Sequence, residues 1–216
     1  AKVVSHRKLI LPQLAGPGVA AHHVRKESGF RVVYGPILAT DLPAFMDAGF
    51  KATPEMRQKS FDILERAVLI PVELVAALKW AIIVLPVFFL LSGLGGPDTF
   101  WINLLDKGIY AVLSLLAAII SGAIITPLLL PWLPGRAFSL KGLIVGLITA
   151  GILIILRGKS IGCLEAVAWF FLIPAISAFL AMNFTGASTY TSLSGVKKEM
   201  KWAVPLEIGG GIIGVC

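Results

Sequence analysis

The 216-residue chain has little charge and almost no cysteine. Only 14% of its residues are Asp, Glu, Lys or Arg, whereas soluble domains carry about 25%. Two cysteines are too few for a disulfide scaffold or for a cluster held by cysteines alone. Of the three histidines, His22 and His23 are neighbours whose side chains should diverge on a helix, so we predict no shared metal site. These shortages exclude an ordinary soluble enzyme and a disulfide-rich module.

Apolar residues are abundant instead. They make up 57% of the chain, and the mean hydropathy is +0.88. A run of about 17–25 apolar residues is long enough to cross the hydrocarbon core of a bilayer. None of the runs alternates apolar and polar residues, so they predict helices rather than barrel strands. We predict five transmembrane helices, at about residues 68–94, 109–130, 140–156, 163–182 and 202–216.

The positive charge is concentrated before the first apolar run. Residues 1–66 hold ten of the 19 Lys and Arg residues, and the loops after the second and fourth runs add five more. The opposite side has only Lys107, Arg157 and Lys159. The positive-inside rule therefore places the N-terminal domain in the cytoplasm. We expect a multi-pass protein of the cell inner membrane, whose net charge of +7 requires no nucleic-acid partner.

The first third of the chain has an α/β pattern. Its order of strand, helix and strand is typical of a parallel layer. Gly29 and Gly49 should end two helices, and Thr53 should cap a third helix that runs through Arg66. We predict strands at residues 8–14 and 31–34 and helices at residues 19–28, 41–48 and 54–66.

Two strands are too few for a stable sheet. We therefore expect residues 1–53 to be the C-terminal part of a Rossmann-like domain in a longer protein, with its first strands upstream of Ala1. Residues 54–67 would be a linker helix, and residues 68–216 the transmembrane domain.

Ligands of such folds bind at the carboxyl ends of the strands. The predicted strands end at two short loops, which contain neither a dinucleotide fingerprint nor a Walker motif. The loops are equally compatible with plain tight turns. The candidate binding residues are Gly16, Pro17, Gly18, Val19, Gly35 and Pro36.

Charged residues within apolar runs are costly and often functional. Glu73 and Lys79 lie in the first run, and Glu207 lies in the fifth. Anchoring at the headgroups and helix pairing are the alternatives to a site. Glu207 precedes the glycines at 209–211 and 214, which allow close helix packing. This spacing places Glu207 at a seam between helices.

The segment 183–200 differs from the other connections. It has seven Ser, Thr or Tyr hydroxyls within twelve residues, followed by a basic cluster. Because it lies on the same predicted side as the N-terminal domain, it is a candidate to dock that domain or to hold a polar ligand. A plain connector is the alternative.

Several of these segments resemble one known family. They are residues 11–22 (LPQLAGPGVAAH), 33–37 (VYGPI), 41–45 (DLPAF), 48–53 (AGFKAT), 183–192 (NFTGASTYTS) and 194–200 (SGVKKEM). In this order, ahead of and between apolar runs, they resemble the mercury-methylating corrinoid proteins. More distantly, the first third is similar to the large subunit of the corrinoid iron–sulfur protein of acetyl-CoA synthesis.

The resemblance implies a cytoplasmic Rossmann-like domain that binds a cobalamin-type corrinoid, followed by a five-helix membrane domain. It implies an anaerobe's methyltransferase that passes a methyl group from cobalt to Hg(II) and forms methylmercury. A small ferredoxin-like partner with two [4Fe–4S] clusters would supply electrons. The strand-end loops would line part of the corrinoid pocket.

The chain departs from the family at the cobalt ligand. The family places this ligand in an Asn-x-Trp-Cys-Ala-Ala-Gly-Lys helix, and neither Cys163 nor Cys216 has those neighbours. We therefore expect the axial cysteine upstream of Ala1, and the catalytic residue of this chain is unknown. Two alternatives stay open. One is an ion-translocating or structural membrane subunit of a methyl-transfer complex, and the other is a corrinoid methyl carrier with a different acceptor.

Overall fold

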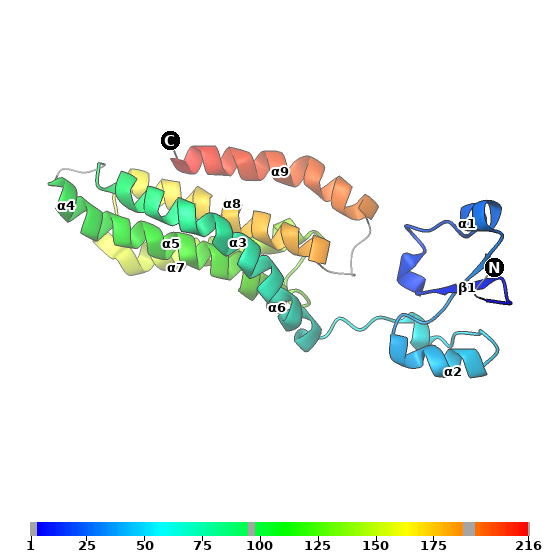
Figure 1. The fold of residues 1–216 in the computed structure, drawn as a ribbon. Coiled ribbons are helices and arrows are strands. Elements are labelled where there is room, and N and C mark those ends of the chain that lie inside the picture. Colours follow the sequence, from blue (N-terminus) through cyan, green and yellow to red (C-terminus); the bar gives the residue numbers. More distant parts are fainter. Residues whose placement is uncertain (1–3, 95–97, 188–192, 216) are drawn as a thin grey trace. The chain divides into compact units, whose positions relative to one another are not determined.

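The computed structural model describes residues 4–94, 98–187 and 193–215. The chain divides into two compact units, Ala1–Phe61 and Asp62–Cys216, which are described separately below. Figure 1 shows strands in the first unit and long helices in the second.

The first unit is built around two parallel strands. β1 (Lys8–Leu11) pairs with β2 (Arg31–Tyr34), and Leu11 lies opposite Tyr34 in the register. α1 (Ala21–Ser28) connects the two strands and packs against β2. The predicted strand–helix–strand order is thus confirmed. One strand pair does not make a doubly wound sheet, so the Rossmann-like domain stays a prediction.

β1 ends three residues before the predicted boundary. Pro12 follows it, and proline has no amide hydrogen to donate to a strand ladder. The chain turns instead into a 3₁₀ helix at Gln13–Ala15. The helix that we expected to begin at residue 19 begins at Ala21.

Two predicted glycine stops are confirmed. Gly29 ends α1 with φ of 74°, and Gly49 follows α2 (Leu42–Asp47) with φ of 68°. Both angles lie in the left-handed region, which glycine adopts without a Cβ clash.

The continuous helix predicted from Thr53 through Arg66 is wrong. Only a single 3₁₀ turn forms, at Glu55–Arg57, although the Thr53 hydroxyl accepts a 3.4 Å hydrogen bond from the Met56 amide. The Met56 carbonyl instead accepts a 3.0 Å hydrogen bond from the Ile37 amide. A growing helix would need that carbonyl for an amide four residues on. The long helix therefore starts only at Ile63.

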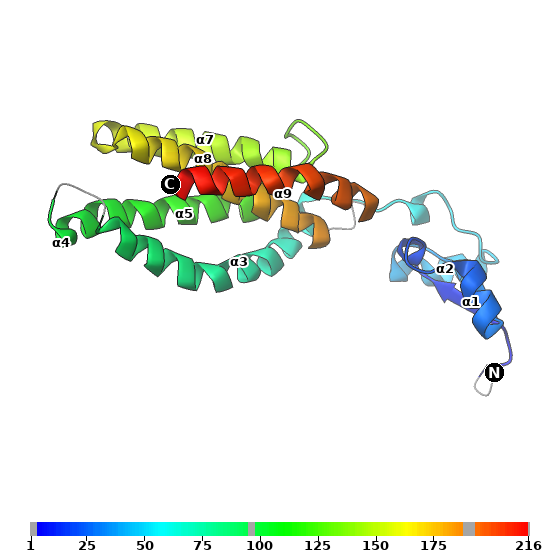
Figure 2. The same cartoon turned by 90° about the horizontal axis from the view of Figure 1, so that it is seen from above.

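The second unit contains four helical segments that are long and apolar enough to cross a bilayer, among the described residues. The second of them is continuous from residue 100 to 129 and includes two π-helical turns. Figure 2 shows the helices lying side by side, with α3 visibly curved. α3 contains Pro71 and Pro86, which remove two backbone hydrogen bonds and account for the curve. The helices are α3 (Ile63–Ser92), α4 (Phe100–Asn103), α5 (Ile109–Ile120), α6 (Thr126–Leu129), α7 (Phe138–Arg157), α8 (Cys163–Ala187) and α9 (Leu193–Val215).

The count of five spans is not confirmed. The fifth predicted span, residues 202–216, falls within α9 except for Cys216, which lies outside the described residues. α9 packs along α8. α9 is not among the candidate spans of the described chain. Its first turns carry Lys197, Lys198, Glu199 and Lys201, which lower its hydropathy. The helical membrane class is supported, with four spans and one further helix that packs on them.

Segment 183–200 is more helical than a connector. α8 continues to Ala187, and α9 already begins at Leu193. Residues 188–192, which include most of the predicted hydroxyl cluster, lie outside the described residues.

Candidate functional site

The candidate site of the first unit is the loop that follows β1. Gly16, Pro17 and Gly18 are exposed there, at the carboxyl end of the strand. A Cβ added to Gly18 would meet only the Ala15 carbonyl oxygen, at 3.9 Å. Gly18 therefore borders open space, as a residue in the wall of a binding surface should.

The amides of this loop are already used within the loop. The Gly18 and Val19 amides both donate to the Ala15 carbonyl, at 3.0 and 2.9 Å, and the Gly16 amide donates to Gln13. They are not free to cradle a phosphate in the way of a glycine-rich nucleotide loop. The loop presents a surface of small apolar residues, which suits contact with a flat organic face.

The loop that follows β2 lies beneath the surface. Gly35 and Pro36 are buried, and the Gly35 amide donates a 2.8 Å hydrogen bond to the Leu11 carbonyl. A Cβ on Gly35 would lie 3.1 Å from Cγ2 of Ile10. These two residues support the strand ends and do not line a wall themselves.

Tyr34 connects the two loops, and the sequence did not single it out. Its hydroxyl donates a short hydrogen bond to the Val19 carbonyl, and its ring lies beneath Gly16. The sequence does contain a signal for this role, because Tyr34 is the last residue of the second predicted strand. A side chain at that position reaches the neighbouring strand's loop in a parallel pair.

The loops at the carboxyl ends of β1 and β2 meet one of the requirements of a corrinoid site. The small exposed surface around Gly18 is suited to part of a macrocycle's face. No cysteine lies in the first unit, and the described residues of the whole chain contain no group of three His, Cys, Asp or Glu side chains fit for a metal ion. The loops thus supply a wall and no cobalt ligand.

The two neighbouring histidines lie closer together than expected. The ring centroids of His22 and His23 are 4.3 Å apart on exposed α1, although adjacent side chains on a helix should diverge. Rotamers that bring the two imidazoles together, with 39° between the ring planes, account for the approach. Cys163, in the second unit, is exposed and not in a disulfide.

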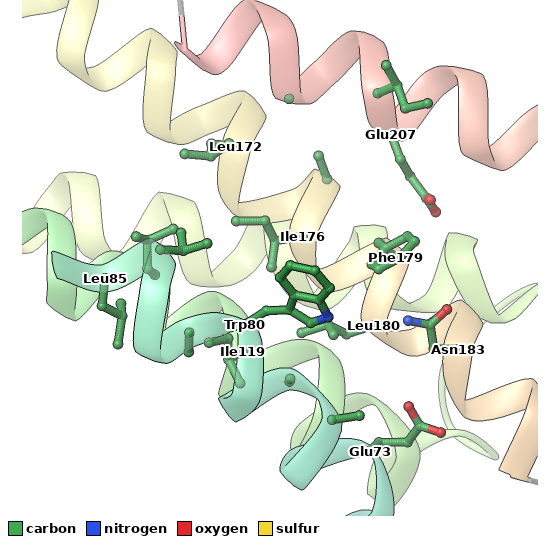
Figure 3. A pocket seen from close by; sticks show the side chains of 18 of the residues that line it. Glu73, Trp80, Leu85, Ile119, Leu172, Ile176, Phe179, Leu180, Asn183 and Glu207 are labelled. Carbon is green, nitrogen blue, oxygen red and sulfur yellow. The ribbon is translucent and has the colours of Figure 1, made fainter. Parts of the chain in front are cut away.

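Two of the three membrane candidates share one cavity. Glu73 of α3 and Glu207 of α9 both line a cavity of about 570 Å³ between α3, α5, α8 and α9. Figure 3 shows both carboxylates at the same end of it, with Asn183 of α8 between them. Lys79 is exposed and does not line it. The structure therefore places the two acids in the lining of one cavity and leaves the base apart.

Among the described residues, Glu207 has no partner for its charge. Both of its carboxylate oxygens are buried and accept no hydrogen bond from the described part of the chain. The seam predicted from the adjacent glycines is formed by Gly210 and Gly214, whose Cβ atoms would lie 3.4 Å from Ala175 and 2.9 Å from the Ala168 carbonyl. Glu207 lies one turn before this contact and reaches the cavity.

No protein-family model, no curated protein and no solved structure matches the chain. The site is thus defined by its residues and by the sequence resemblance described above.

Proposed function

We propose that this chain is part of a membrane-anchored, corrinoid-dependent methyltransferase that transfers a methyl group to Hg(II) and forms methylmercury. The observation that carries the proposal is the position of two of the segments that resemble the corrinoid-protein family. Residues 11–22 and 33–37 follow adjacent parallel strands and meet through the Tyr34–Val19 hydrogen bond. The carboxyl ends of parallel strands are where such folds bind their ligands.

In this proposal, the chain's own residues position the cofactor. Gly16, Pro17 and Gly18 would hold the corrinoid at their exposed surface, Val19 and Tyr34 fix their loop, and Gly35 and Pro36 support the strand ends. When bound, the corrinoid supplies the cobalt-bound methyl group.

The membrane helices keep the corrinoid unit at the inner membrane, with the first unit in the cytoplasm. A ferredoxin-like protein with two [4Fe–4S] clusters supplies electrons. Arg157 is one of the few bases on the opposite side in this assignment. It pairs with Asp106 at 2.5 Å and lies over the Tyr110 ring.

The test is a methyl-transfer assay on the protein isolated anaerobically from its native membranes. The assay supplies Hg(II) and measures methylmercury by mass spectrometry. We expect Gly18→Trp to reduce the rate at least about tenfold. An indole at this exposed position would occupy the space beside the loop that the cofactor needs. The matched control is Ala48→Trp, which changes an exposed residue of the same unit outside both loops and should keep the rate.

The outcomes separate the alternatives. Equal rates for the two tryptophan variants would mean that the strand-end loop is not part of the site. Corrinoid binding without methylmercury formation would instead indicate a methyl carrier with a different acceptor.

A further inference from the structure

The cavity between α3, α5, α8 and α9 is unusual in its charge. Among the described residues, its lining includes Glu73 and Glu207 and no Lys, Arg or His. An unpaired carboxylate in apolar surroundings is costly. No described residue donates a hydrogen bond to the two oxygens of Glu207, so a cationic ligand would supply the missing positive charge.

The cavity is also polarised along its length. Glu73, Asn183 and Glu207 lie toward one end, whereas Leu85 and Leu172 lie toward the other (Figure 3). The indole of Trp80 lies between the two ends and presents an aromatic face. Aromatic faces attract organic cations, and carboxylates pair with them.

We propose that this cavity binds a hydrophobic organic monocation, with its positive charge toward Glu207 and Glu73 and its apolar groups along Trp80 and Leu172. The volume of about 570 Å³ lies within the range of small-molecule sites. The lining contains no Cys, Met or His, so it offers no soft ligand for a mercury species. The inference is independent of methyl transfer.

The probe is tetraphenylphosphonium, and its binding is measured on the full protein in lipid nanodiscs, with empty nanodiscs subtracted. Tetraphenylborate has nearly the same size and shape with the opposite charge, so it is the matched ligand control. We expect saturable binding of the cation only. Glu207→Gln should weaken it about tenfold or more, which corresponds to the loss of one charge-assisted contact.

Glu165→Gln is the control variant, because Glu165 is a carboxylate of α8 that does not line the cavity. It should bind the cation as the unchanged protein does. Thermal unfolding of each variant shows whether the bundle is intact. Trp80→Phe, which keeps the shape of the wall, should weaken binding only a few-fold.

Three results would overturn the proposal. They are the absence of saturable cation binding, equal binding of tetraphenylborate, and unchanged affinity in a folded Glu207→Gln protein. Any of them would mean that the cavity holds only lipid acyl chains.

Discussion

At the scale of single residues, a few side chains join segments far apart in the sequence. Tyr34 joins the two strand-end loops, and Glu199 of α9 reaches the start of α7, sixty residues away. Its carboxylate accepts a 2.7 Å hydrogen bond from the Ser139 amide, one of the free amides of that helix's first turn. A carboxylate there also faces the positive end of the helix dipole.

Replacing Tyr34 with Phe removes one hydrogen bond and keeps the ring. We expect the unfolding free energy to fall by about 1 kcal/mol. Hydrogen exchange measured by mass spectrometry should accelerate in residues 15–19. Unchanged exchange there would mean that the hydroxyl does not hold the loop.

Replacing Glu199 with Ala leaves the Ser139 amide without its acceptor. The expected loss of stability is about 1–2 kcal/mol, as for other helix caps. Glu199→Gln keeps a carbonyl oxygen and should lose less, while exposed Lys198→Ala should be neutral. Thermal unfolding in detergent measures all three, and equal melting of the Ala and Gln variants would argue against capping.

At the scale of helices, glycine determines which faces touch. Gly142 and Gly146 lie one turn apart on α7 and face α8 so closely that a Cβ would lie 2.6 Å from the Ser177 carbonyl oxygen or the Pro174 Cα. The Ser177 hydroxyl donates a 2.8 Å hydrogen bond to the Gly142 carbonyl. This is the small-xxx-small packing of membrane helices.

Glycine-to-alanine substitutions in α7 should have opposite effects on stability, depending on which face of the helix they lie. Gly142→Ala and Gly146→Ala should each destabilise the bundle by about 1–3 kcal/mol through overpacking. Gly151→Ala on the same helix meets no atom within 4 Å and should stabilise it by up to about 1 kcal/mol through helix propensity. Denaturation in mixed micelles compares the three variants. A loss of stability at Gly151 would contradict the assignment of the packed face.

The success of sequence-based prediction at this scale depended on local signals. β2, the glycine ends of α1 and α2, and the presence of the first four apolar helices follow from residue pattern alone. The second of these helices begins at Phe100, nine residues before its predicted start. The linker helix failed because the Met56 carbonyl has a tertiary partner, Ile37, that no local pattern reveals. The close packing of Gly142 was missed because a glycine in a helix signals contact only when the facing helix is known.

At the scale of the whole molecule, the account predicts which side of the membrane each exposed segment faces. We expect Cys163, which is exposed at the start of α8, to lie on the side of the membrane opposite the first unit, because three candidate spans precede it. In a Cys216→Ser background, an impermeant maleimide should label Cys163 in right-side-out vesicles. Leu38→Cys, an exposed site in the first unit, should react only in inverted vesicles once Cys163 and Cys216 are both replaced by Ser. The reverse labelling pattern would mean that the predicted membrane orientation is wrong.

The candidate site was predicted only in part. The loop at Gly16–Gly18 and the acids Glu73 and Glu207 were identified from residue type, because glycines after a strand and charges in apolar runs are rare enough to notice. That the two acids share one cavity, and that Lys79 lies outside it, depends on helix packing. Residue type and spacing along one helix cannot supply that information.

The central claim is that the first unit contributes to a corrinoid pocket. It is tested most directly by the corrinoid content of the protein isolated anaerobically from its native membranes, measured by absorbance and by cobalt analysis. The account predicts about one corrinoid per chain, and a marked loss in Gly18→Trp but not in Ala48→Trp. A folded protein that holds no corrinoid, even after anaerobic reconstitution with cobalamin, would contradict it.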